Sequence, residues 1–211
     1  MKKIVVILVL LLFFSPNLIL AQKISVSTFS GDTIIGLFEK DNLLLFGFKC
    51  EPSCLQISGS SYKYGYMDKT GNLVIPVIYD IAYDFYEGLA IVGKCTDTGY
   101  SQWHITPKGE RLYYKNYVDV HNFIGKYAIV DKDGCYHMCH INKKGEPLYT
   151  QTYQWLYNFN PRGEAIGIRN INLNKNICTW VILDIKGTES LIIKGEYNVD
   201  NPPKKIESIY Y

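Results

Sequence analysis

The residues best suited to chemistry lie together in one short segment. Two cysteines and two histidines occur within six positions, at Cys135, His137, Cys139 and His140. Thiolate and imidazole are preferred ligands of Zn²⁺, and cysteine pairs followed by histidine also occur where haem is attached. The spacing has one residue too many for the haem motif, and in an extended strand the two cysteines would lie about 13 Å apart. We therefore expect these cysteines and histidines to be ordinary structural residues of a strand. Metal or haem binding is the alternative.

Aromatic side chains form a second group of candidates, since they make up 14% of the chain. Tyrosine combines a large apolar ring with a hydroxyl group, which suits a binding surface, and ring faces can stack on sugars. Tyrosine also favours strands, where cross-strand aromatic pairs stabilise a sheet without any ligand. The candidate binding residues are Tyr64, Tyr66, Tyr83, Tyr86, Trp103, Tyr113, Tyr114, Trp155 and Trp180.

The elements that position these residues follow from an internal repeat marked by glycines. Gly71, Gly109 and Gly145 are each followed by a tyrosine eight residues later and a phenylalanine fourteen residues later. Gly187 begins a fourth, shortened copy, so the period is about 36–42 residues. The residues concerned are Tyr79, Tyr117, Tyr153, Phe85, Phe123 and Phe159. No helical periodicity occurs beyond the N-terminal segment, and the predicted fold is all-β.

A polar residue three positions before each glycine predicts a hairpin turn. A short polar side chain can accept a hydrogen bond from the backbone two residues on, and glycine can adopt positive φ. We expect a type I turn closed by a glycine bulge. The turn pairs are Asp68 with Gly71, Thr106 with Gly109, Asn142 with Gly145, and Asp184 with Gly187. The strand after the first turn is expected to end at Pro76.

One such hairpin unit is too small to bury its own apolar face, so neighbouring copies are expected to stack. The copies lie near residues 62–99, 100–134, 135–174 and 175–197. Residues 22–61 are interpreted as a degenerate capping copy and residues 198–211 as a C-terminal tail. The period is slightly shorter than the roughly 40–45 residues of a propeller blade. An open, solenoid-like stack is therefore favoured over a small propeller.

The N-terminus predicts export. Lys2 and Lys3 precede an apolar run from Ile4 to Phe14, and the pattern predicts a signal peptide over residues 1–21. The unbroken apolar run is much shorter than the roughly 20 residues of a spanning helix. We expect a periplasmic or secreted protein without stable membrane insertion. The remaining chain carries 20 basic and 20 acidic residues, so no nucleic-acid partner is expected.

An oxidising destination makes disulfides an expectation for the six cysteines. Cys50 and Cys95 end equivalent strands of neighbouring copies, and Cys54 lies one short turn after Cys50. The favoured disulfide therefore joins Cys95 to Cys50 or to Cys54. Cys135 and Cys178 are the next candidate pair. Free buried thiols are the alternative.

The first copy resembles the WG-repeat family of bacterial proteins. The resemblance lies in Tyr64-Gly65-Tyr66-Met67-Asp68-Lys69-Thr70-Gly71, Val74-Ile75-Pro76, Tyr79-Asp80 and Phe85-Tyr86-Glu87-Gly88-Leu89-Ala90. It extends over roughly residues 62–197, although Tyr64, Gln102 and Met138 replace the family's tryptophan. It implies a β-hairpin repeat array with a binding or scaffolding role and no catalytic site.

Paired carboxylates could catalyse hydrolysis, and the candidates are Asp80, Asp84, Glu87 and Asp119. The resemblance implies structural roles for Asp80 and Glu87. The chain has no nucleophile-elbow motif and no glycine-rich phosphate loop before a helix. The expected protein is therefore not an enzyme, has no cofactor, and binds or scaffolds another macromolecule, either protein or glycan. The alternatives are a glycan-binding protein that uses exposed aromatic rings, and the metal or haem protein considered above.

Overall fold

The computed structural model describes residues 24–27, 33–36, 43–49, 62–70, 72–97, 99–198, 203 and 206. Among these residues the regular elements are strands, apart from the short 3₁₀ helix η1 (Leu173–Lys175). No helix within them is long and apolar enough to cross a membrane. The predicted signal peptide, Gly71, Cys50 and Cys54 lie outside the described residues.

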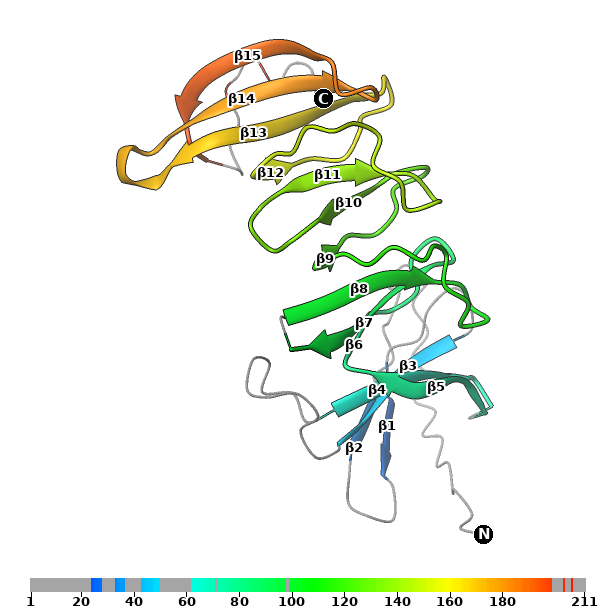
Figure 1. The fold of residues 1–211 in the computed structure, drawn as a ribbon. Coiled ribbons are helices and arrows are strands. Elements are labelled where there is room, and N and C mark those ends of the chain that lie inside the picture. Colours follow the sequence, from blue (N-terminus) through cyan, green and yellow to red (C-terminus); the bar gives the residue numbers. More distant parts are fainter. Residues whose placement is uncertain are drawn as a thin grey trace, which may run out of the picture. The chain divides into compact units, whose positions relative to one another are not determined.

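Within the described residues the strands form five small sheets (Figure 1). The first is β1 (Ile24–Ser27) with β2 (Thr33–Gly36). The second has the order β3 (Leu43–Lys49), β4 (Tyr62–Asp68), β5 (Leu73–Tyr79), and the third β6 (Ile81–Ala82), β7 (Ala90–Thr96), β8 (Gly99–Ile105). The fourth has the order β11 (Met138–Ile141), β10 (Ala128–Asp131), β9 (Asp119–Val120). The fifth contains β12 (Trp155–Leu156), β13 (Glu164–Asn172), β14 (Ile177–Asp184) and β15 (Glu189–Glu196) in that order.

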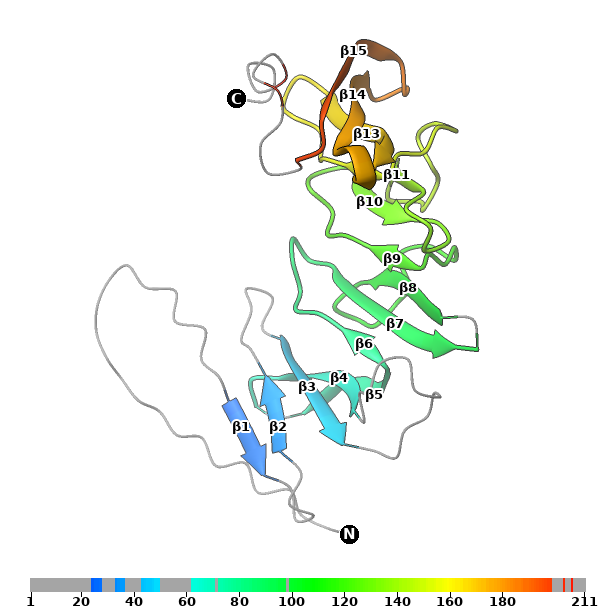
Figure 2. The same ribbon diagram turned by 90° about the vertical axis from the view of Figure 1, so that its left-hand side faces the viewer.

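The chain divides into two compact units. The first contains residues 1–99 and 104–111, and the second contains residues 100–103 and 112–211. The sheets formed by β9–β11 and by β12–β15 belong wholly to the second unit. Figure 2 shows β10 beside β11, and β14 between β13 and β15. The all-β prediction is thus confirmed.

Three of the sheets repeat one strand register. In each, the residue four positions before the turn glycine pairs with a residue of the strand that ends the preceding copy. The antiparallel pairs are Met67 with Leu44, Ile141 with Ala128, and Leu183 with Ala165. Each sheet therefore combines the last strand of one copy with the first strand of the next.

The hairpin turns have the predicted geometry at three positions. Asp68, Asn142 and Asp184 each accept hydrogen bonds on one side-chain oxygen from the backbone N–H groups two and four residues later, at 2.8–3.1 Å. The bonds to Asp68, led by that from the Thr70 hydroxyl, lower the pKa of its carboxyl to about 2. The φ angles at Gly109, Gly145 and Gly187 are 79°, 73° and 78°.

Two turns differ from the expectation. The Thr106 hydroxyl is buried and has no hydrogen-bond partner among the described residues, so only the backbone closes that turn. Asn160 and Gly163 form a further turn of the same kind, since the Asn160 side chain accepts from the N–H groups of Arg162 and Glu164. The third copy has this turn where the first copy has a two-residue turn at Glu87-Gly88.

The predicted strand end at Pro76 is wrong, because β5 continues through it to Tyr79. The pairing of β4 with β5 shifts register around this point, between the pairs Tyr66–Ile75 and Tyr64–Tyr79. β5 is the outer strand of its sheet in the described part of the chain. A proline, which lacks an N–H group, is tolerated at such an edge or bulge.

The core is built from the repeated aromatic residues. Tyr79, Tyr117 and Tyr153 are buried, as are Phe85 and Phe123. Phe159 is half-buried and stacks on His140. The repeated residues identified by their spacing are therefore mainly core positions.

Consecutive copies also contact each other at their turns. A Cβ atom added to Gly145 would lie 2.6 Å from the Tyr113 ring, and one added to Gly187 would lie 2.6 Å from Cβ of Tyr149. Tyr113 and Tyr149 each lie four residues after the glycine of the preceding turn. Glycine is required at these positions both by its positive φ and by the ring packed against it.

Candidate functional site

Four of the nine aromatic binding candidates are wrong, because their side chains are buried. These are Tyr66, Trp103, Tyr113 and Trp180. The polar tips of two of them are used inside the protein. The Tyr66 hydroxyl donates to the Tyr83 carbonyl at 2.6 Å, and Trp180 Nε1 donates to the Glu196 carbonyl at 3.0 Å. Their rings therefore belong to the core and are closed to a ligand.

The other five candidates retain some exposure. Tyr64 and Trp155 are half-buried, whereas Tyr83, Tyr86 and Tyr114 are exposed. Tyr114 is 93% exposed, the most of any large apolar side chain in the described part of the chain. These three exposed tyrosines remain candidates for ligand contact.

The candidate metal ligands do not converge. Cys135 and His137 are exposed in the turn before β11, whereas Cys139 and His140 are buried on β11. His137 Nδ1 instead pairs with the Asp133 carboxylate at 2.7 Å. Within the described residues, no group of three or more His, Cys, Asp or Glu side chains is placed to hold a metal ion.

His140 is held in the core by two hydrogen bonds. Its Nε2 lies 2.9 Å from the Tyr157 carbonyl and its Nδ1 lies 2.5 Å from the Tyr149 hydroxyl. Because a carbonyl only accepts, Nε2 carries the proton and Nδ1 accepts from tyrosine. Burial lowers the pKa of His140 to about 4, so the ring is neutral at pH 7. Both ring nitrogens are therefore occupied by protein groups.

The predicted bridge between Cys135 and Cys178 is not formed. Both are free thiols, and Cys135 is exposed whereas Cys178 is buried. Cys139 is also a free, buried thiol, and burial raises its pKa and that of Cys178. Cys95 is half-buried at the end of β7. Its proposed partners lie outside the described residues, and that pairing stays a prediction.

The carboxylate candidates occupy separate sites. Asp80 forms an ion pair with Lys63 and accepts the Cys95 backbone N–H at 3.1 Å. Asp84 has a buried oxygen with no partner among the described residues, and burial raises its pKa. Glu87 occupies a left-handed turn position at φ 48°, and Asp119 lies beside His121.

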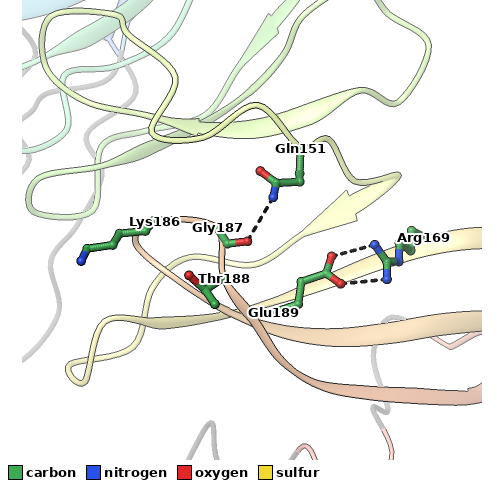
Figure 3. A pocket seen from close by; sticks show the side chains of 6 residues that line it. All are labelled: Gln151, Arg169, Lys186, Gly187, Thr188 and Glu189. Atoms are coloured by element: carbon green, nitrogen blue, oxygen red, sulfur yellow. Dashed lines mark hydrogen bonds and ion pairs between the residues drawn. The ribbon is translucent and has the colours of Figure 1, made fainter.

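A surface hollow that the sequence did not indicate lies in the second unit (Figure 3). Its volume is about 440 Å³, and it is lined by Gln151, Arg169 and the segment 186–189. Arg169 lies on β13. Lys186, Gly187 and Thr188 come from the turn between β14 and β15, and Glu189 is the first residue of β15. Gln151 comes from the loop before β12.

The hollow is organised around one ion pair. The Arg169 guanidinium contacts both carboxylate oxygens of Glu189, each at 2.8 Å. The Tyr153 hydroxyl donates to the same carboxylate at 3.1 Å. In Figure 3 the Gln151 amide lies over the Gly187 carbonyl, to which it donates at 3.4 Å. Donors and acceptors thus line the hollow in fixed positions.

Comparison with known proteins identifies one segment of the chain. Residues 64–94, from β4 into β7, match the model of the WG containing repeat. The match covers most of the first copy, in which the family resemblance was found. No curated protein and no solved structure matches the chain.

Proposed function

We propose that this chain, which carries a segment matching the WG containing repeat, is an exported, non-catalytic binding module. Its partner is a protein that contacts the first unit. The copies would form an open stack whose repeated residues maintain the fold, while residues that do not repeat contact the partner. Export rests on the N-terminal sequence pattern alone.

The observation that carries this proposal is a concentration of exposed apolar side chains between Tyr62 and Tyr86. We call the five residues on β5 and on the loop after β6 the β5 surface. These residues are Leu73, Val74, Ile78, Tyr83 and Tyr86, which are 41–57% exposed. Monomeric proteins rarely expose many large apolar side chains together, and such groups mark interaction sites. Among the described residues β5 is also the outer strand of its sheet, and an outer strand can pair with an added strand.

The polar chemistry of the described residues also favours binding over catalysis. Asp80 is paired with Lys63, Glu189 with Arg169, and both nitrogens of His140 are hydrogen-bonded inside the protein. A general base must instead reach a substrate proton with a free lone pair. These pairs support a structural role for the groups that would otherwise be the first catalytic candidates.

The experiment compares two triple variants of the full chain. Leu73→Ser, Ile78→Ser and Tyr83→Ser alter the β5 surface, and Leu173→Ser, Ile177→Ser and Ile192→Ser alter equally exposed apolar positions of the second unit. Each protein is immobilised and used to capture proteins from the cell envelope of the source organism. Circular dichroism first establishes that both variants are folded.

We expect one or more proteins that bind the unaltered chain and the second-unit variant equally. The β5-surface variant should retain less than a tenth of them. Equal capture by both variants, or no protein captured above background, would contradict the proposal.

A further inference from the structure

The hollow of the second unit departs from the repeat that surrounds it. Glu189 lies two residues after its turn glycine, where the earlier copies have Pro147 and Arg111. Gln151 lies six residues after Gly145, where the second copy has Lys115 after Gly109. The turn and core residues keep their types between copies, whereas these lining residues change. The fold of the repeat therefore does not require a carboxylate at Glu189 or an amide at Gln151.

The ion pair in the hollow is bidentate and remains partly in contact with water. The Arg169 side chain is 36% exposed and that of Glu189 is 15% exposed. Ion pairs that remain in contact with water contribute about 0–1 kcal/mol. The pair does hold two planar groups at fixed positions, since Glu189 accepts from Arg169 and from Tyr153. Such preorganisation reduces the entropy lost when a ligand binds.

The arrangement of charge decides which ligands fit. Arg169 already uses two of its donor groups in contacts with Glu189. Lys186 is the other cationic residue among those that line the hollow. A ligand carboxylate or phosphate would be repelled by the Glu189 carboxylate. A ligand cation would meet both Arg169 and Lys186. A charged ligand of either sign therefore meets at least one group of like charge in the hollow.

A neutral ligand with several hydroxyl groups avoids both conflicts. Each hydroxyl can donate to a lone pair of Glu189 or of the Gln151 amide oxygen, and accept from Arg169, Lys186 or the Thr188 hydroxyl. Two neighbouring hydroxyls on a sugar ring can bond to this pair together, one by accepting from the Arg169 guanidinium and the other by donating to the Glu189 carboxylate. The volume of about 440 Å³ also falls within the range of small-ligand sites.

We propose that the hollow lined by Gln151, Arg169 and residues 186–189 binds a neutral oligosaccharide through its hydroxyl groups. This site goes beyond the proposed function, because it lies in the second unit and takes a different class of ligand. It also replaces the buried tryptophans as the basis for glycan binding. Glu189 accepts from the sugar, while Arg169 and Lys186 donate to it.

The test titrates the full chain by calorimetry with four probes. Three are neutral tetrasaccharides, of β-1,4-linked glucose, N-acetylglucosamine and mannose, and the fourth is hexaglutamate. The variant Thr188→Trp fills the hollow from an exposed position. Its matched control is Glu146→Trp, at the equivalent exposed position of the preceding turn. Gln151→Ala is a second variant, which removes an exposed amide without adding bulk.

We expect saturable binding of at least one neutral tetrasaccharide, weakened at least tenfold by Thr188→Trp and by Gln151→Ala. Glu146→Trp should change the affinity less than twofold. The proposal is overturned if no neutral tetrasaccharide binds, if neither hollow variant weakens binding, or if hexaglutamate binds more tightly. The β5-surface variant should bind the sugar normally, so this result is independent of the test for a protein partner.

Discussion

His140 illustrates how one position of the repeat accepts two kinds of polar ring. It occupies the position held by Tyr66 in the first copy. The Tyr66 hydroxyl donates to the carbonyl of Tyr83, and His140 Nε2 donates to the carbonyl of Tyr157. Both carbonyls belong to the residue four positions after the repeated tyrosine. The histidine therefore satisfies a buried backbone group and needs no metal to explain its presence.

This role predicts a pH dependence of stability. The pKa of His140 is about 4 in the folded protein and about 6.5 in the unfolded chain. Below pH 6.5 the unfolded chain gains a proton that the folded protein does not bind. We expect the free energy of unfolding to fall by about 3 kcal/mol from this residue alone between pH 7 and pH 4. Urea unfolding at several pH values measures it.

The variant His140→Tyr should remove this part of the pH dependence. It keeps a donor for the Tyr157 carbonyl, although Tyr149 loses its acceptor, and a loss of about 1–3 kcal/mol at pH 7 is expected. The control His121→Gln removes an exposed histidine, so it distinguishes the loss of the buried ring from the loss of any histidine. An identical slope in His140→Tyr and in the unaltered chain would contradict the assignment.

At the scale of the elements, the turn between two strands is also a contact between two copies. The turn at Gly145 packs on Tyr113 of the preceding copy, and the hydroxyl of buried Tyr117 donates to the Gly145 carbonyl at 2.7 Å. Burial raises the pKa of Tyr117, so this hydroxyl remains a donor well above neutral pH. The turn thus needs its glycine for two reasons that a sequence pattern does not separate.

Alanine substitutions separate these two reasons. Gly145 and Gly88 have similar φ angles, 73° and 77°, but an added Cβ meets Tyr113 at Gly145 and nothing within 4 Å at Gly88. Gly88→Ala should lower the free energy of unfolding by about 1–2 kcal/mol through backbone strain. Gly145→Ala should add about 1–3 kcal/mol from overpacking. Urea unfolding compares them, and equal losses would mean that the contact with Tyr113 is not tight.

For the whole molecule, the important feature is that sheets and sequence copies are out of phase. The strand that ends one copy pairs with the strand that begins the next in the same register in three sheets. A single copy therefore cannot complete a sheet by itself. Beside the fourth copy, Ile206 from the segment after β15 packs against the core next to Trp180.

Ile206 should therefore stabilise the second unit even though it lies beyond the last strand. It is fully buried in a cluster with Ile166, Ile168, Cys178 and Trp180. We expect Ile206→Ala to lower the free energy of unfolding by about 2–5 kcal/mol. The control Ile192→Ala alters a side chain that is 56% exposed and should cost much less. Tryptophan fluorescence reports the transition, because Trp103, Trp155 and Trp180 all belong to the second unit. Equal effects of the two variants would show that Ile206 does not belong to the core.

Local residue order alone determined the all-β class, the hairpin turns and most of the core. A turn such as Asn142 to Gly145 depends on hydrogen bonds and a φ angle within five residues, so its pattern is visible in the sequence. The repeated tyrosines were visible for a similar reason, because the spacing itself marked them. The wrong strand end at Pro76 shows what local sequence cannot predict. The proline is tolerated because β5 is the outer strand of its sheet, and that place depends on strands distant in the sequence.

Only the tertiary structure decided which polar and aromatic groups reach the surface. Trp180 and Tyr114 look equally suitable for binding in the sequence, yet one is buried under the last strand and the other is almost fully exposed. The hollow joins Gln151, Arg169 and Glu189, which come from a loop and two strands of different copies. Whether a side chain is buried, and which side chains meet in a hollow, depends on how segments distant in sequence pack together. The residue pattern of a single copy therefore cannot predict either.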